Sequence, residues 1–66
     1  MLKHQYQNIA KQGAKEASAA FKELKAAGEE QYENTIVDYV LQAQIKLAAA
    51  QKAIDMLLEA YRSDEG

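Results

Sequence analysis

The chain of 66 residues contains no cysteine and no proline, and its three glycines stand at positions 13, 28 and 66. Without cysteine it can form neither a disulfide nor a thiolate metal site, and with a single histidine, His4, it lacks the ligands for a zinc cluster. A chain this short builds only a small hydrophobic core. Its stability must therefore come from regular helix packing or from association with a partner.

The chain also lacks a long apolar run. No stretch approaches the roughly 20 apolar residues that span a bilayer, and the start, MLKHQYQNIAKQ, lacks the apolar core of a secretory signal. The formal net charge of −2 argues against a general affinity for nucleic acid. We therefore expect a cytoplasmic protein without membrane insertion and do not expect nucleic acid as a partner.

Residues with high helix propensity dominate the amino-acid composition: alanine, lysine, glutamate, glutamine and leucine. They predict an all-α fold, an antiparallel two-helix hairpin that turns at Gly28. We expect one domain over residues 1–66, with a first helix at about 2–27, a second at about 29–62 and a frayed tail at 63–66. Residues 1–27 carry a net charge of +3 and residues 28–66 one of −5, so the two halves attract each other.

Three signals favour a turn at Gly28. Glycine adopts the left-handed conformation that ends many helices. Basic residues on one side of it and acidic residues on the other match the dipoles of a helix that ends and a helix that begins: Lys22, Lys25, Glu29, Glu30 and Glu33. One continuous rod would instead hold an interior glycine that costs about 1 kcal/mol.

The second helix shows the clearest periodicity. Its apolar residues recur in steps of four and three, which predicts a heptad seam facing the first helix: Ile36, Val40, Ala43, Leu47, Ala50, Ile54, Leu57 and Tyr61. The matching face of the first helix is weaker: Leu2, Tyr6, Ile9, Gly13, Ala17, Ala20, Phe21 and Leu24. Folding at Gly28 places Ala43 level with Gly13 and Leu47 level with Ile9. The last two turns of the second helix should then overhang the first.

Some apolar residues of the second helix remain uncovered in this arrangement. One group lies roughly opposite the seam and the other lies in the overhang, whereas an ordinary amphipathic helix has one apolar stripe. We predict that both groups bind a partner protein: Leu41, Ile45, Ala49, Met56, Leu57, Leu58 and Tyr61.

Residues that carry chemistry are few. His4 has no nucleophile placed near it, and the carboxylate pairs Glu29/Glu33 and Asp55/Glu59 have the i, i+4 spacing of solvated helix faces. We predict no catalytic, cofactor-binding or metal site, no small-molecule substrate and no enzyme activity. The exposed lysines of the first helix, which could contact phosphates, should instead pair with the acidic second helix: Lys11, Lys15, Lys22 and Lys25.

The stretch GEEQY at 28–32 and the run AQKAIDMLLEAY at 50–61 resemble a known family. Together with the length and the two-helix plan, they are similar to the small E-type co-chaperones of type III secretion needles, the YscE/PscE/SsaE-like proteins. The resemblance implies that the hairpin joins a tetratricopeptide-like chaperone. The two together would hold the needle subunit unpolymerised in the bacterial cytoplasm.

Three functional interpretations stay open. The first is an adaptor or co-chaperone whose second helix docks on another helical protein. The second is a homodimeric four-helix bundle resembling the plasmid protein Rop, in which the lysines contact nucleic acid. The third is a structural coiled-coil segment in which Gly28 is helical. The partner is therefore another helical protein or a second copy of the chain.

Overall fold

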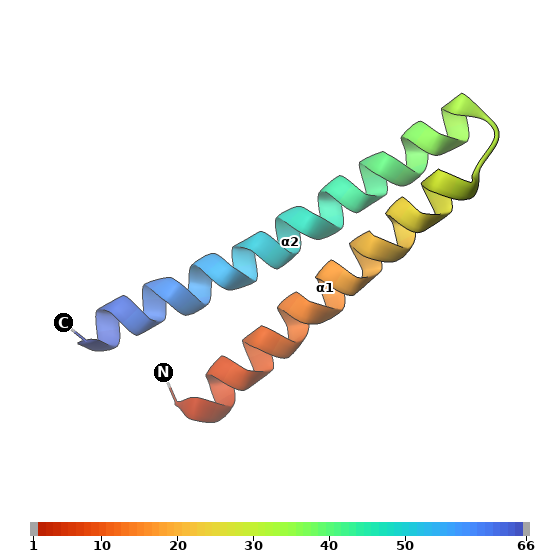
Figure 1. The fold of residues 1–66 in the computed structure, drawn as a ribbon. Helices are drawn as coiled ribbons and strands as arrows, with labels where there is room; N and C mark the ends of the chain where they lie inside the picture. The colour runs from red at the N-terminus through yellow and green to blue at the C-terminus, as the bar shows by residue number, and fades with distance from the viewer. Residues whose placement is uncertain (1, 66) are drawn as a thin grey trace.

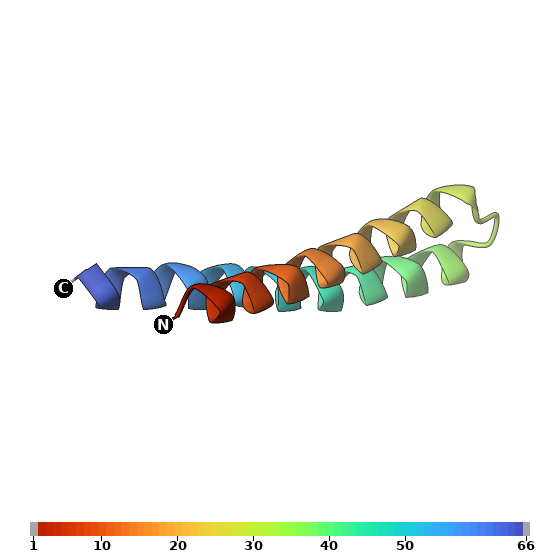
Figure 2. The same cartoon turned by 90° about the horizontal axis from the view of Figure 1, so that it is seen from below.

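The computed structural model describes residues 2–65 of the chain and their side chains as far as Ser63. It contains two long helices, α1 (Lys3–Glu29) and α2 (Glu33–Glu65), that run antiparallel side by side (Figure 1). The predicted all-α hairpin is confirmed, with overall extents of 51 × 17 × 10 Å. Seen from below, the helices cross at a shallow angle (Figure 2). Residues 63–65, expected in a frayed tail, are part of α2, and Gly66 lies outside the described residues.

The chain reverses just after Gly28 rather than at it. Gly28 is helical, and no glycine among the described residues has a positive φ, so a left-handed glycine does not end α1. Glu29, expected in the first turn of the second helix, lies in the last turn of α1, which contains no basic residue. α1 ends two residues later than predicted, and Ala27 near its end packs on α2, where it is 7% exposed. This burial favours the longer helix in spite of the low helix propensity of glycine.

Residues 30–32 form the connection between the helices. Glu30 is extended, with φ −87° and ψ 145°. Its carboxylate oxygen Oε1 accepts hydrogen bonds from the backbone N–H groups of Gln31 (2.9 Å) and Tyr32 (3.4 Å). The side chain of Glu30 therefore satisfies two backbone donors of the connection itself.

The residues buried between the two helices are all small. They are alanines with one glycine: Gly13, Ala20 and Ala27 of α1, and Ala43, Ala50 and Ala53 of α2. A Cβ atom added to Gly13 would lie 3.0 Å from the Cβ atom of Ala53. The two backbones thus approach each other closely at this point, and glycine is what permits it.

This contact sets the register of the hairpin and corrects the predicted one. Gly13 lies opposite Ala53, whereas the sequence placed it level with Ala43. Moving the turn along the chain by a given number of residues shifts every pairing between the antiparallel helices by twice that number. The later turn therefore accounts for more than half of this shift. As a result, Leu58 and Tyr61 do not overhang but lie beside α1, near Tyr6.

The face of α2 that packs on α1 is also rotated from the predicted seam. The residues of α2 that are buried or half-buried on this side recur in steps of three and four: Ile36, Tyr39, Ala43, Lys46, Ala50, Ala53, Leu57 and Ala60. Alternate members of the predicted seam are therefore correct, and the others are wrong: Val40, Leu47, Ile54 and Tyr61 are exposed. The close approach of the backbones explains this choice, because large side chains would hold the helices apart.

Among the described side chains, Lys46 of α2 and Glu23 of α1 form an ion pair across this interface, between Nζ and Oε1. Both side chains are largely buried. The pair has the opposite polarity to the one expected, since the lysine comes from the acidic half of the chain and the glutamate from the basic half.

Candidate protein-binding face

The exposed members of the predicted seam form one line along α2. Val40, Leu47, Ile54 and Tyr61 are each seven residues apart, or about two helical turns, and are between 44% and 55% exposed. Val37 and Leu58 lie next to this line and are also about half exposed. Half of the predicted seam therefore faces solvent along one side of the hairpin.

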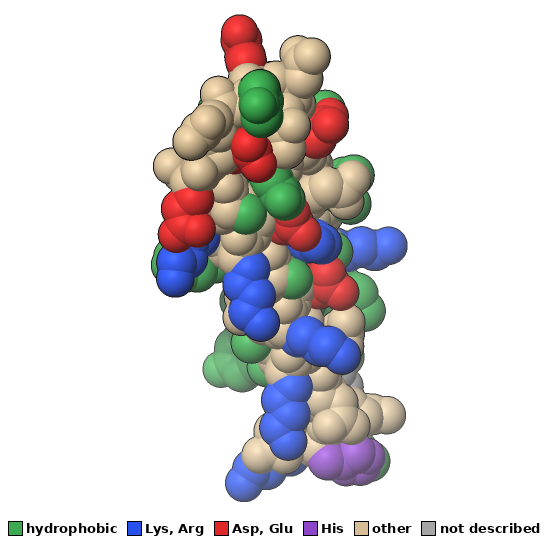
Figure 3. Space-filling model, turned by 90° about the vertical axis from the view of Figure 1, so that its right-hand side faces the viewer, with side chains coloured by type: hydrophobic (Ala, Val, Ile, Leu, Met, Phe, Trp, Pro, Cys, Tyr) green, Lys and Arg blue, Asp and Glu red, His purple; other side chains and the backbone are tan. Residues whose placement is uncertain are grey.

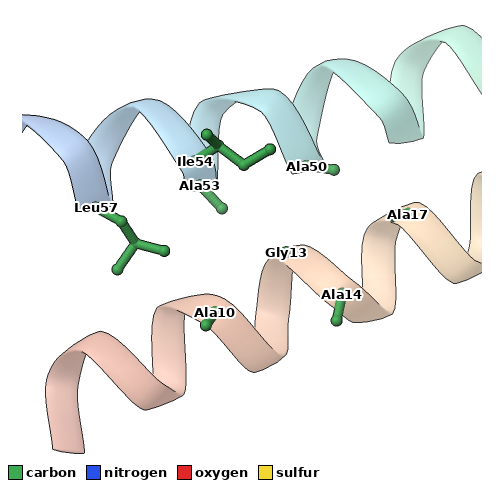
Figure 4. A pocket seen from close by; sticks show the side chains of 8 residues that line it. All are labelled: Ala10, Gly13, Ala14, Ala17, Ala50, Ala53, Ile54 and Leu57. Atoms are coloured by element: carbon green, nitrogen blue, oxygen red, sulfur yellow. The ribbon is translucent and has the colours of Figure 1, made fainter. Parts of the chain in front are cut away.

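α1 contributes a second line on the same side of the molecule. Its residues recur in steps of four and three: Ala10, Ala14, Ala17, Phe21 and Leu24. The alanines of this line and Ile54 of α2 line a hollow of about 260 Å³ between the helices. Figure 4 shows the side chains of both helices around this hollow, with Leu57 reaching towards α1.

A second hollow continues the first towards the open end of the hairpin. It lies between Tyr6 and Ala10 of α1 and Leu58 and Tyr61 of α2. We call the whole surface the apolar face and define it by its apolar residues: Ala10, Ala14, Ala17, Phe21, Leu24, Val37, Val40, Leu47, Ile54, Leu58 and Tyr61.

The apolar face carries no charge along most of the molecule. The line on α1 runs from position 7 to position 28, and the line on α2 runs from position 37 to position 61. Apart from the apolar residues already named, these two lines contain only Gln7, Gly28, Gln44 and Gln51. Charged residues of both signs occupy the other sides of the helices. Figure 3 shows Lys and Arg side chains gathered along one side of the molecule, with acidic side chains towards the end that holds the turn.

The structure separates the predicted partner-binding residues onto different sides of α2. Leu58 and Tyr61 belong to the apolar face, and Leu57 is half-buried against α1. Leu41, 49% exposed, lies on the outer side of α2, away from α1. On the flank opposite the apolar face lie Ile45, Ala49 and Met56, where Met56 borders a hollow together with Lys52, Asp55 and Glu59.

Sequence reasoning missed most of the apolar face because it assigned those residues to the helix–helix contact. Val40, Leu47 and Ile54 have the spacing of a seam, and only their size argues against that role. Gly13 and the surrounding alanines were a usable signal, since small residues on one helix favour a close contact with small residues on the other.

The polar residues of the described chain do not gather into a site. Among the described side chains, no group of three or more His, Asp or Glu could hold a metal ion. Neither helix has, within its described residues, an apolar stretch long enough to cross a membrane. The lysines that could contact phosphates are exposed on the outside of α1: Lys11, Lys15, Lys22 and Lys25.

Comparison with protein-family models, with curated proteins and with solved structures finds no match to this chain. The resemblance to secretion co-chaperones therefore stays a prediction.

Proposed function

We propose that the chain is a non-enzymatic, protein-binding helical hairpin whose apolar face docks on the helices of another chain. The observation that carries the proposal is the apolar face itself, which has half-exposed Leu, Ile, Val and Tyr side chains on one side and no charge among them. Contiguous exposed apolar surface rimmed by polar residues is typical of sites where proteins associate.

The total exposed area supports the same proposal. The hairpin exposes 5217 Å², whereas a compact monomer of its 7.3 kDa mass would expose about 4,200 Å². Two helices cannot enclose a core, so α2 packs on α1 mainly with its small residues and leaves many of its large ones about half exposed. Because these side chains are already about half buried, covering each of them with further helices would gain about 0.7–1.5 kcal/mol, roughly half the value for full burial.

The role that fits such a surface is that of an adaptor or co-chaperone, in which the hairpin adds two helices to a helical partner. The resemblance of GEEQY and AQKAIDMLLEAY to the needle co-chaperones favours this role. In that case the hairpin would act in the cytoplasm, as part of the chaperone that holds a secretion subunit.

A matched pair of substitutions tests the proposal. Leu47 on the apolar face and Leu41 on the outer side of α2 are 47% and 49% exposed, so glutamate at either position perturbs the hairpin itself to a similar degree. We expect Leu47→Glu to abolish co-purification of the partner from host cells, and Leu41→Glu to retain it. Quantitative mass spectrometry of the captured proteins measures the difference, and circular dichroism checks that both variants stay helical.

The reverse result, in which Leu41→Glu releases the partner and Leu47→Glu does not, would place the docking surface on the outer side of α2. Equal capture by the parent and both variants would mean that neither surface binds.

A further inference from the structure

We propose that the occupant of the apolar face is a second copy of this chain. The two hairpins would form a four-helix bundle about a two-fold axis parallel to their long axis, with both turns at the same end. The inference rests on the proposed function, since it names the helices that the apolar face covers. In this arrangement α1 of each copy lies over α2 of the other.

The absence of charge on the apolar face is what self-association requires. In a two-fold dimer the same patch contributes to both sides of the interface, so each charge on it would be buried twice. The lines from position 7 to 28 and from 37 to 61 contain only apolar residues, glutamine and glycine. Two copies can therefore meet without burying an unpaired charge.

The two lines of the apolar face also match each other in size. Around the hollow α1 contributes alanines, whereas α2 contributes Ile54, with Leu58 at the neighbouring hollow. A two-fold axis parallel to the hairpin preserves height, and Gly13 marks the height of Ala53. Ile54 of the second copy then comes to the height between Ala10 and Ala14, where it can enter the hollow as a knob enters a hole.

Charges at the rim favour this arrangement over one with the turns at opposite ends. Lys11 precedes Gly13 by two residues and Asp55 follows Ala53 by two, so both lie at the same height, on the outer sides of their helices. Within one hairpin they point away from each other. In the proposed bundle Lys11 lies beside Asp55 of the second copy, twice by symmetry, whereas opposed turns would bring the lysines of one α1 against those of the other.

The area fits a stable dimer. The hairpin exposes 5217 Å², about 1,000 Å² more than a compact chain of its mass exposes. Standard interfaces bury about 800 Å² of each partner. Covering the apolar face with one further hairpin would therefore bring the exposed area per chain to the ordinary value.

The first test is the mass of the purified, untagged chain by sedimentation equilibrium at about 50 μM. We expect twice the 7.3 kDa of one chain. Ile54→Glu should give the mass of one chain. The control Ile45→Glu, on the opposite flank, should remain dimeric.

The second test uses charge reversal at the exposed rim, where the hairpin tolerates substitution. Lys11→Glu alone or Asp55→Lys alone should weaken the dimer roughly 2- to 30-fold at low salt, since two rim pairs are affected. The two changes combined in one chain should restore the affinity of the parent. A double variant that stays as weak as the singles would overturn the proposed arrangement.

A parent chain that sediments as a monomer would overturn the second-copy proposal and leave the proposed function standing, because the capture experiment with Leu47→Glu is independent of it. A dimer that Ile45→Glu disrupts and Ile54→Glu preserves would overturn both.

Discussion

Replacing the two helical glycines by alanine provides a stringent test of the packing in this hairpin. Gly13 and Gly28 both lie within α1. In each case alanine raises helix propensity, which stabilises an interior position by up to about 1 kcal/mol. The surroundings differ, since a Cβ atom on Gly13 meets the Cβ atom of Ala53 at 3.0 Å, whereas one on Gly28 meets nothing within 4 Å.

The expected magnitudes follow from this difference. The methyl group of Ala53 cannot rotate away, so Gly13→Ala forces the helices apart, and overpacking of this kind costs about 1–3 kcal/mol. The gain in propensity offsets part of that cost. We expect Gly28→Ala to stabilise the protein by up to about 1 kcal/mol, and Gly13→Ala to be neutral or to destabilise it by up to about 2 kcal/mol.

Thermal unfolding followed by circular dichroism measures both effects. In a domain this small, 1 kcal/mol corresponds to about 4–8 °C in Tm. All variants should be compared at one protein concentration, because association shifts the apparent stability. Equal stabilisation by both substitutions would refute the close contact at Gly13. Destabilisation by Gly28→Ala would refute the helical conformation of Gly28 and restore the turn that the sequence predicted there.

Two further experiments test the core and the register. Ala20 is fully buried, so Ala20→Leu should cost about 1–3 kcal/mol in urea unfolding, while Ala48→Leu on the exposed side of α2 should change stability by less than about 0.5 kcal/mol. Cysteines at Ile9 and Leu57 should cross-link within one chain under mild oxidation, because the register places them level. Cysteines at Ile9 and Leu47 should not, and mass spectrometry of the oxidised chains would reveal the opposite outcome.

The sequence was sufficient to predict the helices and the hairpin, because its composition favours helix throughout and nothing but glycine interrupts it. The exact turn could not be predicted in the same way. Propensity marks Gly28 as the weakest point, but α1 continues through it. In the folded hairpin Ala27 is buried on α2, and the Glu30 carboxylate accepts two backbone hydrogen bonds within the connection. Both gains depend on the folded structure.

The apolar face could not be predicted for the same reason, since it also depends on how the two helices pack in the folded structure. Hydrophobicity ranks Val40, Leu47 and Ile54 above alanine, so periodicity along one helix assigns them to the contact between helices. The structure buries Ala50 and Ala53 instead. How closely two helices approach depends on small residues meeting across the pair, which a pattern within one helix does not show.

Protection of single cysteines can show which side of the hairpin binds, since the parent chain has no cysteine of its own. Cysteine in place of Leu47 reports on the apolar face, and cysteine in place of Leu41 reports on the outer side of α2. In dilute, purified protein we expect similar rates of maleimide labelling at both positions, because both side chains are about half exposed. On association, whether at high concentration or in the host lysate, position 47 should become protected while position 41 stays reactive. Equal labelling of both positions under every condition would contradict the claim that the apolar face is where this hairpin binds.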